Sequence, residues 1–212
     1  MAKRREDRQK RREGVLQAAL EVIVERGLAN TRMTDIAKRA GMSPGNILYY
    51  FESKDDLLMD LLRWSEDLLL RQANEEFDRL PSYADRLQRL TELAAPAGPS
   101  DPGWILWLEV WSLSPHDERI GRGHADLDRR WVGTLADLVR SGQEAGEFSP
   151  DIDPKDFAVR YGAMMDGLAI KVVAGIDGMD VARLLEACSA TAVRELGLRV
   201  PRRPRKRTRA VP

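Results

Sequence analysis

The chain has few of the residues from which disulfides and metal sites are built. Its 212 residues include one cysteine, Cys188, and two histidines, His116 and His124. A lone cysteine excludes an internal disulfide and fits a reducing compartment. A structural zinc site takes about four Cys or His ligands, which is more than this chain contains. We therefore expect no metal site, and no motif in the chain predicts a cofactor.

Long apolar runs and an export signal are missing as well. No hydrophobic stretch reaches the roughly 18 residues of a membrane-spanning helix. The first residues, MAKRREDRQKRREG, are charged, and no apolar segment follows them as it would in a secretory signal. Hydrophobic residues still make up 43% of the chain, which is enough for a sizeable core in one or two domains. We expect a cytoplasmic protein with no membrane partner.

Signals for β-structure are also absent, and helical periodicity dominates. The sequence has no sustained two-residue alternation and no Asn-Gly or Asp-Gly hairpin between β-branched runs. Apolar residues instead recur at three- and four-residue spacing, which predicts an all-α fold. The expected helices span approximately residues 8–27, 32–40, 43–50, 53–77, 82–94, 104–113, 116–145, 154–175 and 180–196.

Charge is unevenly distributed, although Lys and Arg together equal Asp and Glu in number. Residues 1–54 hold 12 basic and 7 acidic residues, residues 55–198 hold 15 and 27, and residues 199–212 hold 7 basic residues and no acidic one. This asymmetry predicts a basic head, an acidic body and a basic, disordered tail. Only the two ends are then suited to a polyanion, unless their charges simply face solvent.

Residues 31–54, TRMTDIAKRAGMSPGNILYYFESK, carry the strongest functional signal. Gly41 separates two short helical segments, and Ser43 followed by Pro44 is a strong helix start. This pattern predicts a helix-turn-helix, in which the second helix enters the major groove of DNA. Asn46 is the best direct reader, because an amide can donate to and accept from adenine.

The same segment resembles the TetR family of bacterial transcriptional regulators. The matching residues are Asp35-Ile36-Ala37, Ala40-Gly41-Met42-Ser43, Tyr50-Phe51, Ser53-Lys54 and Asp56-Leu57-Leu58. The resemblance implies a three-helix DNA-binding head over residues 1–54 and a larger helical domain over 55–198 that binds a ligand and dimerises. By this resemblance and the helix-turn-helix geometry, the expected DNA contacts are Thr34, Ser43, Pro44, Gly45, Asn46, Leu48, Tyr49, Tyr50 and Lys54.

The sequence departs from the family pattern at two of these positions. Position 48 is usually Tyr in the family but is Leu48 here, and position 44 is often Lys or Arg but is Pro44 here. Asn46 is then nearly the only side chain in this helix suited to a bidentate base contact. A basic arm precedes the first helix and either reaches the minor groove and phosphates or is merely solvated; its residues are Lys3, Arg4, Arg5, Arg8, Lys10, Arg11 and Arg12.

The stretch WILWLEVWSL, residues 104–113, allows two interpretations. In the first, the tryptophans are core residues and Glu109 pairs with Arg130 or Arg160, because an unpaired buried charge is costly. In the second, tryptophan rings and Glu109 line a pocket for a cationic or amphipathic small molecule. Residues 104–150 resemble the choline-responsive BetI-type subgroup, which favours the pocket. The candidate ligand-binding residues are Trp64, Trp104, Trp107, Glu109, Trp111 and Met164.

The last two expected helices are rich in Gly and Ala, which permits close helix packing. The resemblance implies that these helices form a homodimer interface, so that two heads read a palindromic DNA operator. We therefore expect a ligand-responsive transcriptional regulator, most simply a repressor.

Two other classes of function are weaker readings. Gly41-Met42-Ser43-Pro44-Gly45 matches the G-x-S-x-G nucleophile elbow, but that motif requires a preceding strand and none is predicted. Both histidines are expected at the surface, so we expect no enzyme activity. A sequence-tolerant architectural DNA-binding protein remains the alternative, and it predicts no preferred operator.

Overall fold

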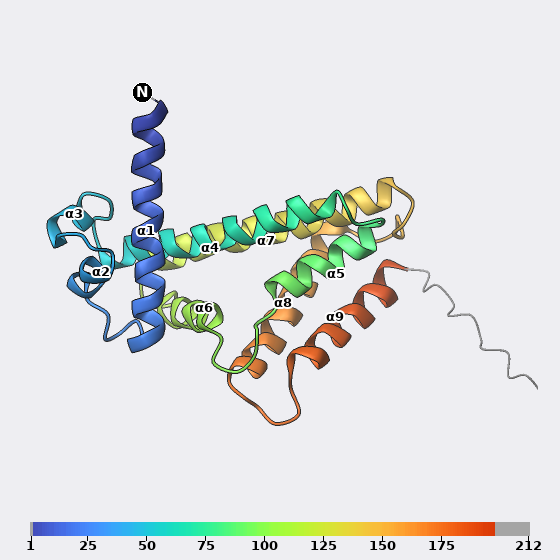
Figure 1. Ribbon diagram of the computed structural model, residues 1–212. Helices are drawn as coiled ribbons and strands as arrows, with labels where there is room; N and C mark the ends of the chain where they lie inside the picture. Colours follow the sequence, from blue (N-terminus) through green and yellow to red (C-terminus); the bar gives the residue numbers. More distant parts are fainter. Residues whose placement is uncertain (1, 198–212) are drawn as a thin grey trace, which may run out of the picture.

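The computed structural model describes residues 2–197, and over this range the chain forms nine helices and no strand. This confirms the predicted all-α fold (Figure 1). The predicted basic tail, residues 199–212, lies outside the described residues. The helices are α1 (Ala2–Arg26), α2 (Met33–Arg39), α3 (Pro44–Leu48), α4 (Lys54–Phe77), α5 (Tyr83–Ala94), α6 (Pro102–Leu113), α7 (Glu118–Glu144), α8 (Pro154–Val173) and α9 (Val181–Leu196).

The helix-turn-helix forms as the local sequence predicts. Helices α2 and α3 lie together at one end of the molecule beside α1 (Figure 1). Gly41 takes a left-handed conformation, with φ of 65°, in the turn between them, which a residue with a side chain adopts only with strain. Ser43 caps α3 by accepting a hydrogen bond from the Asn46 backbone N–H at 3.3 Å, and Pro44 occupies the first helical position.

Helix α1 starts much earlier than expected. The predicted arm before residue 8 is helical from Ala2, so the basic segment is part of α1, whose first turns project beyond the head (Figure 1). Side-chain pairs four residues apart support this extension. Lys10 pairs with Glu6 at 3.0 Å, and Gln9 donates to Glu13 at 2.9 Å. Such pairs stabilise a helix by a few tenths of a kcal/mol each.

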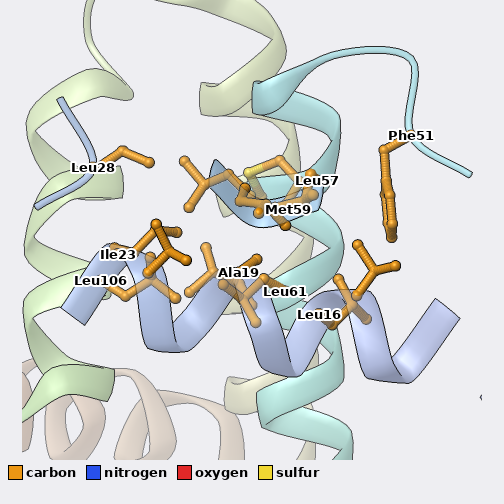
Figure 2. Packing of buried hydrophobic residues seen from close by; sticks show 14 of the residues in the cluster. Leu16, Ala19, Ile23, Leu28, Phe51, Leu57, Met59, Leu61 and Leu106 are labelled. Atoms are coloured by element: carbon orange, nitrogen blue, oxygen red, sulfur yellow. The ribbon is translucent and has the colours of Figure 1, made fainter. Parts of the chain in front are cut away.

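One hydrophobic cluster joins the head to the body. Leu16, Ala19 and Ile23 of α1 face α4 and α6 (Figure 2). The cluster includes fully buried Phe51, which directly precedes α4, and Leu106, from α6, which is 1% exposed. The expected boundary between residues 54 and 55 stays a prediction, since the cluster contains residues from both sides of it.

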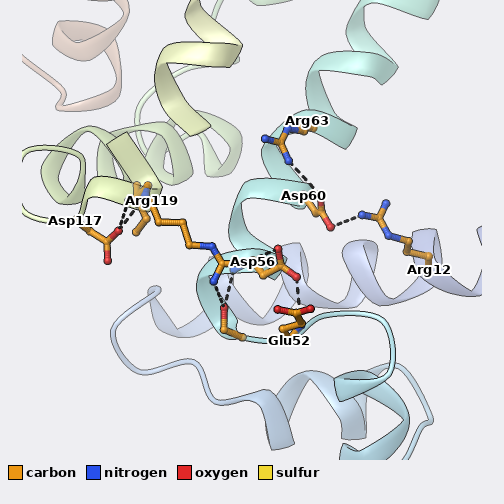
Figure 3. A network of polar contacts seen from close by, with 9 residues as sticks. Arg12, Glu52, Asp56, Asp60, Arg63, Asp117 and Arg119 are labelled. Atoms are coloured by element: carbon orange, nitrogen blue, oxygen red, sulfur yellow. Dashed lines mark hydrogen bonds and ion pairs between the residues drawn. The ribbon is translucent and has the colours of Figure 1, made fainter. Parts of the chain in front are cut away.

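A polar network ties the start of α4 to α1 and α7 (Figure 3). Ser53 caps α4 by accepting from the Asp56 N–H at 3.0 Å. The Asp56 carboxylate accepts from the Glu52 N–H at 3.2 Å and from Arg119 at 3.1 Å. Arg119 opens α7, so this contact ties the start of α4 to the start of α7.

The body has a second core built mainly from α5, α7, α8 and α9. Long helices α4 and α7 run side by side across the molecule (Figure 1). In the core, the Tyr161 ring stacks on Phe157 with centroids 5.1 Å apart, and its hydroxyl lies 2.8 Å from the Thr91 hydroxyl. Thr91 also donates to the Leu87 carbonyl, so it accepts from Tyr161. This pairing satisfies two buried hydroxyls at once.

Candidate functional site

The exposed side of α3 carries most of the predicted DNA-contact residues. Ile47 is fully buried and anchors the helix on the head. Leu48 is 55% exposed and Tyr49 is 67% exposed, which is unusual for large hydrophobic side chains. The residues at the start of the helix that share this exposure are Ser43, Pro44, Gly45 and Asn46.

The two tyrosines after α3 have different environments. Tyr49 is exposed, and the Arg8 guanidinium of α1 lies over its ring at 5.2 Å from the centroid. Tyr50 is half-buried, packs on the head core and meets Tyr49 edge to face with centroids 5.2 Å apart. Tyr49 is therefore the freer of the two, and its position beside Arg8 brings the extended α1 next to the recognition helix.

The other two predicted contacts lie outside α3. Thr34 is exposed in the first turn of α2. Lys54 is half-buried at the start of α4, and its ammonium donates to the Leu28 carbonyl at 2.5 Å. That bond uses one of three ammonium donors and ties α4 to the turn after α1. Lys54 thus has a structural role, and the other two donors suit a phosphate.

A cavity of about 280 Å³ opens within the body between α4, α5, α6, α7 and α8. Its lining is mostly apolar and strongly aromatic. Helix α6 supplies one wall, where Trp104 and Trp111 meet edge to face with centroids 6.1 Å apart. The Trp104 Nε1 donates to the Ala94 carbonyl at 3.0 Å, which fixes this ring against the end of α5. The tryptophans that line the cavity are Trp104, Trp107, Trp111 and Trp131.

A hydrogen-bond chain fixes Trp111 in the wall. Its Nε1 donates to His124 Nε2 at 2.7 Å, so the His124 proton lies on Nδ1 and is donated to Ser114 at 3.1 Å. Ser114 in turn donates to the Val110 carbonyl at 2.7 Å. Burial lowers the pKa of His124, and the nearby Asp128 carboxylate opposes this shift. His124 is therefore half-buried and neutral, whereas the sequence had suggested a surface residue.

Carboxylates from four segments also line the cavity: Glu66, Asp101, Asp128 and Asp166. Asp101 is engaged, because it caps α6 by accepting from the Trp104 N–H at 3.0 Å. Asp128 and Asp166 take part in no ion pair or hydrogen bond with other described side chains. Burial raises the pKa of Asp166 to about 6, and the nearby negative charge of Asp128 adds to this shift.

Glu66 is the most buried of these acids, with 8% of its surface exposed. Arg130 lies 3.3 Å away, yet neither carboxylate oxygen of Glu66 has a hydrogen-bond partner among residues 2–197. The Arg130 guanidinium instead donates to Asp67 at 2.6 Å. Burial raises the pKa of Glu66 more than the Arg130 charge lowers it. The cavity thus holds a buried acid without a hydrogen-bonded counter-ion.

The structure separates the predicted ligand-binding residues into two groups. Trp104, Trp107 and Trp111 line the cavity, whereas Trp64, Glu109 and Met164 do not. Met165, the neighbour of Met164, is the methionine in the lining.

The expected ion pairs of Glu109 are wrong. Arg130 pairs with Glu66 and Asp67, Arg160 pairs with Asp156 and Glu195, and Glu109 has no ion pair within the described part of the chain. Glu109 is only half-buried, so water can solvate its charge. Helix α6 is correspondingly not buried all round, since only Leu106 and Val110 are fully enclosed.

The small residues of α8 and α9 face two ways. Gly162, Ala169 and Ala192 are buried in the body core. The outward-facing set is exposed to solvent in the single chain and consists of Ala163, Gly167, Ala174, Ala182 and Ala190. The hydrophobic side chain of Val159, also on α8, is 48% exposed.

The structure offers no support for the hydrolase reading. Gly41 to Gly45 runs from the turn after α2 into the start of α3, so a helix and not a strand precedes the motif and the geometry of a nucleophile elbow is not formed. Residues 2–197 contain no cluster of three or more metal-ligating side chains. None of the helices in this range is long and apolar enough to cross a membrane.

A helix-turn-helix head on a helical body with its own cavity is the architecture of a ligand-responsive, DNA-binding transcriptional regulator. The family model for bacterial regulatory proteins of the tetR family matches residues 15–61, and the model for the BetI-type transcriptional repressor C-terminal domain matches residues 83–197. The chain belongs to the TetR family and has a C-terminal domain of the BetI type. Members of this family are regulators, not enzymes.

Individual relatives agree with this assignment. The regulator BetI 1 from Chromohalobacter salexigens is 30% identical over 82% of this chain and 84% of its own. A transcriptional regulator from Saccharomonospora viridis, solved in complex with choline, is 34% identical with a TM-score of 0.74, and the match covers 87% of this chain and 96% of that one. A TetR-family regulator from Rhodococcus sp. is 28% identical with a TM-score of 0.75, covering 86% and 98%.

Proposed function

We propose that the protein is a homodimeric repressor that binds a palindromic operator and is released by a cationic small molecule. The observation that carries this proposal is an exposed recognition helix and an acidic, tryptophan-lined cavity joined by helix α6. The protein would act in the cytoplasm, where its DNA is accessible.

The exposed faces of α8 and α9 support the dimer. Small side chains let helices approach closely, and an exposed row of them next to Val159 suits a contact with a second copy. A two-fold axis through this face would relate the α3 helices of the two subunits, so that one dimer presents two recognition helices to DNA. Two recognition helices read half-sites about one helical turn of DNA apart, or a multiple of it, which requires a palindromic operator.

The chemistry of the cavity supports a cationic effector. Tryptophan faces attract cations, and unpaired carboxylates in a partly desolvated site strengthen that attraction. Glu66 is buried and lacks a hydrogen-bond donor, so a cation that binds there would relieve the cost of its burial. The similar protein from Saccharomonospora viridis was solved in complex with choline, which supports a cationic effector for this chain as well.

Helix α6 is suited to connect the cavity to the head. Trp104 and Trp107 lie in the cavity wall, while Leu106 and Val110 on another face of α6 belong to the core shared with α1 and α4. A ligand that moves α6 would therefore shift the head. In thermodynamic terms, the ligand favours a spacing of the two recognition helices that does not fit the operator.

Selection of bound sequences from random DNA by the full-length protein tests the DNA part of this proposal. We expect a palindromic consensus. Equal binding to all sequences would contradict the regulator and favour the architectural alternative.

Choline tests the effector part, with operator binding followed by fluorescence anisotropy. We expect choline to weaken operator binding by the wild type. The Glu66→Gln variant should need a higher choline concentration for the same effect while keeping its operator affinity without ligand. Asp137→Asn, an equal charge change at an exposed site on α7, should respond as the wild type does. An unchanged choline response in Glu66→Gln would remove Glu66 from the site.

A further inference from the structure

The first turns of α1 lie outside the part of the chain that matches the family. The family model for the DNA-binding head begins at residue 15, whereas α1 begins at Ala2. Residues 2–14, called here the α1 extension, add roughly 20 Å of helix at about 1.5 Å per residue. Their first turns project beyond α2 and α3 (Figure 1). The α1 extension is therefore a feature of this chain that the shared head does not explain.

The buried face of α1 becomes basic in the extension. Arg8 and Arg12 precede Leu16 at four-residue spacing, and Arg11 precedes Val15 in the same way, so these side chains follow two adjacent rows along the helix. Leu16 and Val15 are fully buried in the core of the head. Arg8 and Arg11 are exposed. The face that packs into the head at residue 15 is thus a basic surface in the preceding turns.

Two contacts fix the α1 extension relative to the recognition helix. The Arg12 guanidinium forms an ion pair with Asp60 of α4 (Figure 3) and lies 5.3 Å from the centroid of the Phe51 ring. The Arg8 guanidinium lies over the ring of Tyr49, which directly follows α3 and is 67% exposed. The basic surface of the extension therefore lies beside the surface that is expected to face DNA.

The positive charge of the α1 extension is only partly neutralised. Lys10 pairs with Glu6, four residues before it, at 3.0 Å. Lys3, Arg8 and Arg11 form no ion pair with the side chains that the structure describes. Arg8 and Arg11 lie about one turn apart, and like charges at this spacing destabilise a helix. An anion bound beside them would remove this cost.

We infer that the α1 extension is a second DNA-contacting element, which binds the phosphate backbone beside the half-site that α3 reads. A helix with its side chains is about 10–12 Å across and the minor groove is about 6 Å wide, so the extension cannot enter that groove as an unfolded arm could. Contacts from Lys and Arg to phosphates carry no sequence information. The extension thus adds affinity without adding specificity.

The length of the extension sets where its contacts fall. From Arg8, which lies beside the recognition helix, α1 continues for six residues to Ala2, or roughly 9 Å. This length corresponds to about three base pairs of flanking duplex. The inference rests on the proposed function, because it requires the head to be bound to DNA.

Operator duplexes with and without flanking DNA test this inference with the full-length protein. Both contain the palindromic consensus obtained by selection. One ends at the outer edges of the half-sites, and the other has about ten more base pairs of arbitrary sequence on each side. The double variant Lys3→Ala, Arg11→Ala removes two cations that touch no other described side chain, and alanine keeps the helix propensity. The charge-matched control is Arg79→Ala, Arg140→Ala, at exposed positions of the body.

Fluorescence anisotropy measures the affinity for each duplex. We expect the wild type and the control to bind the longer duplex at least about tenfold more tightly, because each subunit gains a charge-assisted contact. In the double variant this ratio should fall to within about twofold. A different flanking sequence should give the same ratio. On the longer duplex, the slope of log affinity against log salt concentration should be smaller by about 2 or more in the double variant, since each lost phosphate contact removes about 0.9.

The outcomes separate this inference from the proposed function. The inference is overturned if the ratio or the salt slope of the double variant equals that of the wild type, or if the ratio changes with the flanking sequence. Preference for the consensus over a scrambled duplex would then leave the regulator intact. If the wild type shows no such preference, the DNA part of the proposed function fails, and the salt slopes on the scrambled duplex still test the extension. Thermal unfolding checks that the double variant is folded.

Discussion

At the scale of single residues, the surroundings of each side chain determine which role it can take. Ser43 and Asn46 both open α3, but the Ser43 hydroxyl accepts from the Asn46 backbone and is partly committed to that cap. The Asn46 amide is exposed and carries no hydrogen bond within the described chain. Asn46 is therefore the side chain of α3 best placed for a specific base contact.

Replacement of Asn46 by Ala should relax the preference at one base position of the operator. The loss of a bidentate contact costs about 1–3 kcal/mol of discrimination at that position. Competition binding with single-base operator variants measures this. The matched control is Tyr49→Phe, which removes a hydroxyl that we expect to contact a phosphate. This variant should bind all DNA sequences more weakly by the same factor. Uniform loss in Asn46→Ala would instead assign Asn46 to the backbone.

Asp166 predicts a pH-dependent stability. Its folded pKa of about 6 is above the ordinary value of 3.8, so the folded state binds its proton more tightly than the unfolded state does. The stabilisation is complete below the unfolded pKa and is lost as pH rises through about 6. The Asp166→Asn variant has no carboxylate to titrate and does not lose this stability. The difference in unfolding free energy between the variant and the wild type should therefore increase, in favour of the variant, by roughly 1 kcal/mol between about pH 5 and pH 8.

Urea denaturation of both proteins across this pH range measures the difference. Asp137→Asn serves as the exposed control and should show no comparable trend. If the difference in unfolding free energy between Asp166→Asn and the wild type is the same at every pH, the Asp166 carboxylate is solvated and is not held in a desolvated site.

At the scale of helices, two glycines of α7 have different surroundings: one is required by the packing around it and the other is not. Gly142 is buried, and a Cβ at this position would collide with the ring of Phe148. Gly133 lies on the same helix, and nothing lies within 4 Å of a Cβ built there. Gly142 thus allows the loop after α7 to fold back onto the helix.

Substitution of these glycines by Ala should change stability in opposite directions. Gly142→Ala should destabilise the fold by about 1–3 kcal/mol, because an aromatic ring in a packed core cannot move away cheaply. Gly133→Ala should stabilise it by up to about 1 kcal/mol through helix propensity. Thermal or urea unfolding measures both. If Gly142→Ala is neutral, the Phe148 packing is looser than the structure indicates.

At the scale of the whole molecule, the separation of charge along the chain becomes a separation in space. The head with its basic α1 lies at one end, and the acidic cavity lies within the body (Figure 1). The two parts are joined by the shared hydrophobic cluster and by the ion pair between Arg12 of α1 and Asp60 of α4 (Figure 3). In the proposed function, this continuity carries a change in the cavity to the recognition helix.

The proposed dimer face gives a prediction at this scale. Gly167 is exposed on α8, and nothing lies within 4 Å of a Cβ built there, so Gly167→Arg should leave the fold of one chain intact. It should nevertheless disrupt the dimer and weaken operator binding, because one head holds only one half-site. Analytical ultracentrifugation measures the oligomeric state. Asn74→Arg, at an exposed position of α4, is the control and should remain dimeric; an unchanged dimer in Gly167→Arg would place the interface elsewhere.

The all-α fold and the helix-turn-helix could be predicted from the sequence alone. Ser43, Pro44 and Gly41 act through local backbone chemistry, so their effect can be predicted without knowing the rest of the fold. The tryptophan face of residues 104–113 was visible for the same reason, since helical spacing alone brings Trp104, Trp107 and Trp111 together.

Which charges line the cavity could not be predicted, because it depends on how the helices pack. Glu66, Asp128 and Asp166 lie on three different helices, and no local pattern marks them as neighbours. Glu109 has the obvious position beside the tryptophans, yet it lies outside the lining of the cavity. Burial and pairing depend on how helices pack, and packing is set by contacts between residues far apart in the chain. The identity of the DNA-reading helix was therefore local information, whereas the chemistry of the ligand site was not.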